Sequence, residues 1–221
     1  MMKRDAIYGS ALIASALSGL VTMSMHPTGN QLLADVQHVA PIGLAVHALA
    51  LVALPVSFFG TIGLTRLLGA DGDAPLAALA GLVAYGMAQI AVMIAAVASG
   101  LLAPALAAHM VATTGAEHDV AAALFSYTGA INQAFAKVYV IASSAAILLW
   151  SCAILAHGRL SRAAGMLGAL VGVLALLAVT IGHLRLDVHG FGAVVLSQGI
   201  WMITVGVLLA RSAPEQAQAG L

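Results

Sequence analysis

The stretch GHLRLDVHGFG (182–192) places four ionisable side chains within seven residues: His183, Arg185, Asp187 and His189. An extended chain would point all four the same way. A helix would instead put His183 and Asp187 four residues apart on one face. Either geometry makes a compact polar patch, in a chain with only 7% charged residues. Neutral imidazole is the commonest protein metal ligand, and a carboxylate can orient it through its second nitrogen.

Histidine is the unusual polar residue of this chain, because its eight copies equal the lysines and arginines together. His47 lies inside an apolar run, where an ionisable group usually faces the bundle interior and has a partner. The sequence predicts a site for a metal ion (zinc or copper) or for haem. Its candidate ligands are His38, His47, His183 and His189, with Asp187 as the orienting carboxylate.

The spacing of these histidines requires ligands from several helices. No HExxH or HxxxH pair occurs in the chain. His38 and His47 are nine residues apart, which puts them on opposite faces of a straight helix. Assembly from separate helices is normal for haem or metal sites in helix bundles.

Two other interpretations of the histidines stay open at this point. They could be neutral residues that solvate helix ends at the membrane interface, or a cluster that responds to pH near neutrality. Both fit a non-catalytic, transporter-like or accessory membrane subunit, in which Gln89 and Gln198 serve helix packing or solute passage. The sequence identifies no enzymatic activity; Ser143 and Ser144, for example, have no histidine four residues away.

The elements that must position these residues are membrane-spanning helices. The chain is 62% hydrophobic with a mean hydropathy of +1.06, whereas soluble domains are about 45–50% apolar. A spanning helix needs roughly 20 apolar residues. We therefore expect an all-α polytopic membrane helix bundle, a single transmembrane domain over 1–221. Its six predicted spans are 6–25, 39–68, 75–102, 136–156, 163–182 and 190–210, and a helix beginning near Asp119 is expected to run into the fourth.

Basic residues predict the orientation, because cytoplasmic loops carry an excess of lysine and arginine. The N-terminal side of the membrane holds Lys3, Arg4, Arg66, Arg159, Arg162 and Arg211, and the other side holds only Lys137 and Arg185. Both termini are therefore predicted to be cytoplasmic. Six histidines then face outward: His26, His38, His109, His118, His183 and His189.

Composition also bounds the partners. The formal net charge is zero, which gives no basis for nucleic-acid binding. The expected surroundings are the lipid bilayer of a bacterial inner membrane, with a homo-oligomer or a partner membrane subunit as further possibilities.

Overall fold

The computed structural model describes residues 4–70, 75–182 and 186–211, and this part of the chain is helical with no strand. The elements are α1 (Arg4–Met25), α2 (Gly29–Ala34), α3 (Val36–Leu68), α4 (Pro75–Val97), a π-helical turn η1 (Ala98–Leu102), α5 (Ala103–Ala112), α6 (Gly115–His157), α7 (Arg162–Thr180) and α8 (Val188–Arg211). Six of the resulting helices are long and apolar enough to cross a membrane. The predicted all-α polytopic bundle is confirmed.

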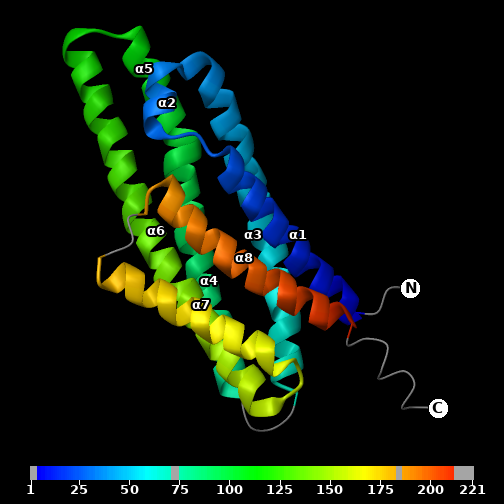
Figure 1. Ribbon diagram of the computed structural model, residues 1–221. Coiled ribbons are helices and arrows are strands. Elements are labelled where there is room, and N and C mark those ends of the chain that lie inside the picture. The colour runs from blue at the N-terminus through cyan, green and yellow to red at the C-terminus, as the bar shows by residue number, and fades with distance from the viewer. Residues whose placement is uncertain (1–3, 71–74, 183–185, 212–221) are drawn as a thin grey trace.

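The bundle has two chemically distinct ends. We call the end that carries Arg4, Arg66, Arg162 and Arg211 the basic end; it lies where α1 and α7 begin and where α3 and α8 finish. We call the opposite end, which holds α2 and the α5–α6 turn, the histidine end. The chain passes between these two ends with each long helix, so α1 and α8 are antiparallel neighbours (Figure 1).

The spans differ greatly in length. The helices α1, α7 and α8 have 22, 19 and 24 residues, close to the roughly 20 that a bilayer requires. The α6 helix has 43 residues, or about 64 Å at 1.5 Å per residue. The longer helices extend past the shorter ones at the histidine end (Figure 1). The predicted fourth span, 136–156, is therefore only the half of α6 nearer the basic end, and α5 continues the third span beyond residue 102.

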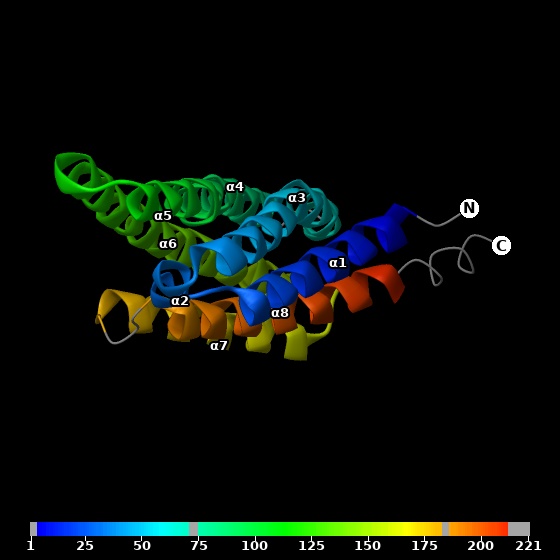
Figure 2. The ribbon, with the colours of Figure 1, turned by 90° about the horizontal axis from the view of Figure 1, so that it is seen from above.

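Close helix packing uses small residues, as expected where lipid removes the hydrophobic drive between helices. A Cβ on Gly168 or Gly172 of α7 would overlap the side chains or backbone of α6. Gly9 of α1 similarly packs on Gly206 of α8. The α1 helix lies between α3 and α8, and α6 contacts both α4 and α7 (Figure 2).

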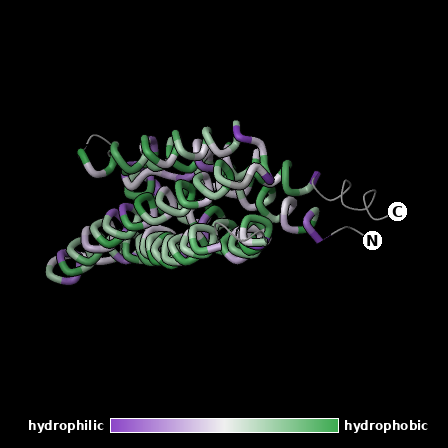
Figure 3. The backbone as a smooth tube through the Cα atoms, turned by 90° about the horizontal axis from the view of Figure 1, so that it is seen from below, coloured by the Kyte–Doolittle hydropathy of each residue, from purple (hydrophilic) through white to green (hydrophobic). Residues whose placement is uncertain are grey.

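Hydrophobic residues predominate along the helices of the bundle (Figure 3), and many large ones are exposed on its outside. Large residues such as Leu76, Val83 and Val52 are 79%, 59% and 68% exposed. A water-soluble protein would bury such residues, whereas a bilayer accepts them. The exposed surface thus supports the same membrane assignment as the composition.

Candidate functional site

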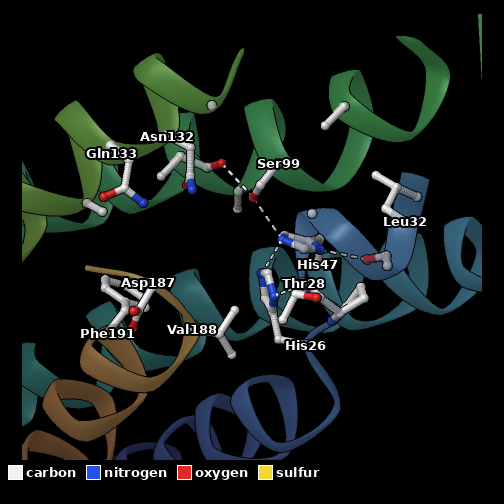
Figure 4. A pocket seen from close by; sticks show the side chains of 18 of the residues that line it. His26, Thr28, Leu32, His47, Ser99, Asn132, Gln133, Asp187, Val188 and Phe191 are labelled. Carbon is white, nitrogen blue, oxygen red and sulfur yellow. Dashed lines mark hydrogen bonds between the residues drawn. The ribbon is translucent and has the colours of Figure 1, made fainter. Parts of the chain in front are cut away.

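A cavity of about 520 Å³ opens among the helices toward the histidine end (Figure 4). It is lined by the loop after α1, by α3, by the η1 turn, by α6 and by the start of α8. Polar lining residues from these elements are His26, Thr28, His47, Ser99, Thr128, Asn132, Gln133, Asp187 and His189. Side chains far apart in the sequence therefore share one space.

Two imidazoles meet at one wall of this cavity. The Nε2 atoms of His26 and His47 are 3.1 Å apart, and their rings lie edge to face with centroids 4.7 Å apart. His47 is only 4% exposed, whereas His26 is half-buried. The hydroxyl oxygen of Ser99, from the η1 turn, lies 2.9 Å from Nε2 of His47 (Figure 4). We call these three side chains the histidine pair and its serine.

Local structure explains how each imidazole is held. His26 follows the last residue of α1 and donates from Nδ1 to the carbonyl of Pro27 at 2.8 Å. Thr28, two residues after His26, is the N-cap of α2 and forms a reciprocal capping box with Gln31, which fixes the course of the loop. His47 lies on α3 and donates from Nδ1 to the carbonyl of Gly43 at 2.6 Å.

The η1 turn makes room for the His47 ring. A π-helical turn inserts extra backbone into an α-helix and is frequent at functional sites. Gly100 lies at the middle of η1, and a Cβ built there would overlap the ring atoms of His47. The imidazole thus occupies the space that any other residue at this position would fill.

When both imidazoles of the pair are neutral, no proton is left to form a hydrogen bond between their Nε2 atoms. Each Nδ1 faces a carbonyl oxygen, so the single proton of each neutral ring lies there and both Nε2 atoms carry lone pairs. Ser99 has one proton, which it donates to the Ala95 carbonyl, also at 2.9 Å, or to Nε2 of His47. In either case Nε2 of His26 faces Nε2 of His47 without a donor. A proton or a metal ion between the two Nε2 atoms would stabilise this contact.

Burial acts against the extra proton on His26. Removal from water lowers the pKa of the His26 imidazole, and the hydrogen bond to Pro27 offsets only part of that effect. The neutral ring, which is the form that binds metal, is therefore favoured in the folded protein.

The histidine pair lies near the membrane boundary rather than deep in lipid. His47 precedes the end of α3 at Leu68 by 21 residues, or about 32 Å of helix, and the hydrocarbon core is about 30 Å thick. His26 directly follows α1, which is itself one bilayer long. Both imidazoles therefore belong to the histidine-end interface.

The residues predicted from the sequence are only partly brought together. His47, Asp187 and His189 line the cavity, and His38 does not. The Asp187 carboxylate caps α8 by accepting from the backbone N–H groups of His189 and Gly190 at 3.1 and 2.9 Å. His183 lies outside the described residues. Within the described ranges, no group of three or more histidine, cysteine, aspartate or glutamate side chains could hold a metal ion.

Three other histidines pair with carboxylates at the surface. His38 contacts Asp35 at 2.9 Å, and His109 lies 3.2 Å from Glu117. His118 is 3.6 Å from Asp119. The hydrogen bond from His38 lowers the pKa of Asp35, but both side chains are exposed, so the pair adds little stability. These contacts suit the interpretation in which histidines solvate helix ends.

Two members of the site were not among the predicted ligands. His26 belongs to a segment that reads as a turn, and Ser99 to a continuous apolar span. Counting residues along each helix from the basic end would have identified His26. It lies 22 residues after Arg4, and His47 lies 19 residues before Arg66, so both stand about one bilayer thickness from the basic end.

Comparisons with protein-family models, with curated proteins and with solved structures find no match to this chain. The assignment of a function therefore depends on the geometry of the cavity.

Proposed function

We propose that this multi-pass membrane protein binds one transition-metal ion, of the zinc or copper class, between Nε2 of His26 and Nε2 of His47. The supporting observation is the proton count: two lone pairs converge with no donor between them. Imidazole nitrogen suits both metals. A metal ion would replace the repulsion of the two lone pairs by two coordinate bonds.

The separation of the two nitrogens fits an ion better than haem. With metal–nitrogen bonds of 2.0–2.1 Å, a separation of 3.1 Å corresponds to an angle of about 100° at the metal, between square and tetrahedral values. Two imidazoles on opposite sides of a haem iron would have nitrogens about 4 Å apart at the same bond length. We therefore favour a mononuclear ion over haem.

The coordination would be incomplete. Two imidazoles leave two or more positions for water or for a small ligand in the cavity, and Ser99 would stand beside them. Structural zinc sites are closed by four protein ligands, whereas open positions are typical of exchangeable or reactive metals. This favours metal handling or ligand activation over a purely structural role. We also propose a bacterial inner membrane as the location, with the histidine end outside, on the distribution of basic residues.

Metal content and thermal stability test this proposal. Wild type, His26→Gln, His47→Gln and the control His38→Gln would be purified in detergent, stripped with chelator and dialysed against zinc or copper(II). We expect about one ion per chain in wild type and His38→Gln, with loss in the other two variants. A ligand at 100 times its Kd stabilises a protein by about 2.7 kcal/mol, so the melting temperature should rise in parallel.

The same experiment separates the rival functions. Wild type that retains no metal and gains no stability would overturn the proposal. A metal-free protein whose stability depends on a proton at the histidine pair would instead favour the pH-responsive interpretation. Equal metal content in all four proteins would show that the metal ion binds at a different site.

A further inference from the structure

A second cavity of about 130 Å³ lies deeper in the bundle. It shares five lining residues with the outer cavity: Thr22, Met23, Ala50, Val92 and Phe191. Its farther wall includes Tyr85, which lies ten residues into α4, or about 15 Å from the basic end. That depth is the middle of a hydrocarbon core about 30 Å thick. The two cavities together therefore extend from the histidine end to the middle of the membrane.

Polar groups line this deep cavity in the part of the bundle where lipid offers none. Tyr139 donates to the Gln198 oxygen at 3.4 Å, and the Gln198 amide donates to Ser143 and Ser144 at 3.0 and 3.1 Å. The side-chain oxygen of Gln89 is buried and accepts no hydrogen bond from any described residue. A buried acceptor without a donor is unfavourable, so this oxygen points to an occupant that donates a hydrogen bond.

The chemistry of the lining selects an uncharged occupant. The described residues that line the deep cavity include amides, hydroxyls and apolar side chains, but no aspartate, glutamate, lysine, arginine or histidine. A cation would meet no compensating charge there. Water needs two to four polar partners and at least about 10–15 Å³ of such space per molecule, and the cavity provides both.

Aromatic packing closes the bundle on the basic side of this cavity. Tyr85 contacts Trp150 with ring centroids 5.5 Å apart, and Trp150 stacks on Trp201 at 6.2 Å. Both indoles are almost fully buried. Trp150 donates to the Ala78 carbonyl and Trp201 to the Ala164 carbonyl. Each ring is thus fixed by a backbone hydrogen bond as well as by packing.

We propose that the two cavities form a one-sided aqueous pathway, in which water from the histidine end reaches Gln89 and ends at Tyr85 and Trp150. The pathway admits water and small uncharged hydrogen-bond donors to the middle of the membrane. It does not depend on metal binding, because none of the groups that define the deep cavity belongs to the histidine pair.

Cysteine accessibility tests the pathway with a matched pair of positions on α3. Ser57 is buried and lines the deep cavity. Thr61 lies one turn nearer the basic end on the same face, is fully buried, and lines neither cavity. The only native cysteine, Cys152, is first replaced by serine. Ser57→Cys and Thr61→Cys are then treated in oriented membrane vesicles with 2-hydroxyethyl methanethiosulfonate, an uncharged reagent that reacts with water-exposed thiolates, and the adducts are followed by mass spectrometry.

We expect Ser57→Cys to react at least tenfold faster than Thr61→Cys. The reaction of Ser57→Cys should also be faster when the reagent is added from the histidine end than from the basic end. Adding Ala50→Phe, which fills the passage between the cavities, should slow the reaction of Ser57→Cys. Ala53→Cys, a second position lining the deep cavity, replaces Ser57→Cys if that variant misfolds. Equal rates for the cavity-lining and control cysteines, or faster reaction from the basic end, would overturn the proposal.

Discussion

Substitution of Gly100 by alanine should separate metal binding from folding. The added Cβ would lie closer than 3.0 Å to the His47 ring, a distance that real Cβ atoms essentially never show. Because ordinary contact begins near 3.4 Å, the imidazole or the η1 backbone must move by on the order of 1 Å. Overpacking of this kind costs about 1–3 kcal/mol in stability.

The substitution should also weaken metal binding, because it changes the separation of the two ligand nitrogens. A shift of about 1 Å can raise the separation of the two Nε2 atoms from 3.1 Å to about 4 Å, which bonds of 2.0–2.1 Å span only in a linear arrangement. We expect zinc affinity to fall at least tenfold, or about 1.4 kcal/mol. Competition against a chromophoric chelator would measure the affinity, and thermal unfolding in detergent would measure the stability.

Gly86→Ala is the matched control for this experiment. Gly86 lies on the same continuous helix, and a Cβ there would be 3.5 Å from Phe58, which is ordinary contact. Alanine is favoured over glycine inside helices by about 1 kcal/mol, so this variant should be neutral or stabilised and should bind zinc normally. If Gly100→Ala binds zinc as tightly as Gly86→Ala does, then the position of the His47 ring does not determine the site.

Three further predictions follow from the same contacts. Burial lowers the pKa of His26 from 6.5, so as the pH falls the unfolded chain binds a proton at this imidazole before the folded protein does. Metal-free wild type should therefore lose stability relative to His26→Gln below pH 6.5, as measured by thermal unfolding at pH 7.5 and 5.5. A relative gain in stability would instead indicate a proton shared by the two imidazoles. Gln198→Leu should destabilise the bundle by about 0.6–2 kcal/mol in detergent unfolding, because it removes the hydrogen bonds to Ser143 and Ser144, and an unchanged midpoint would contradict this. His109→Gln should change stability by less than about 0.5 kcal/mol in the same assay, because its pair with Glu117 is exposed.

The helical bundle could be predicted from the sequence because lipid leaves few alternatives. A run of about 20 apolar residues in a membrane must satisfy its own backbone hydrogen bonds, and a helix does so. The long α6 helix was expected from near Asp119, four residues after it begins at Gly115, although its bilayer span was placed only at 136–156 because the segment from Gly115 to about residue 135 mixes polar and apolar side chains. Hydropathy identifies the part of a helix that lies in lipid, but it does not show whether the helix continues past the lipid.

The candidate site was predictable only in part. His47 stood out because a titratable residue in an apolar run is expensive. Its pairing with His26 depends on the relative depth of two antiparallel helices, which no local spacing motif encodes. The space for its ring depends on the η1 turn and on Gly100, and glycine in an apolar span reads equally well as a helix-packing residue.

The two imidazoles lie only 21 positions apart in the chain, on either side of the first connection between spans. A nascent polypeptide would therefore present both nitrogens as soon as its first two transmembrane segments had inserted. Ser99 arrives only with the next segment. If the proposed site binds a metal ion, an ion captured at that moment would crosslink the first helical hairpin before its remaining neighbours were synthesised.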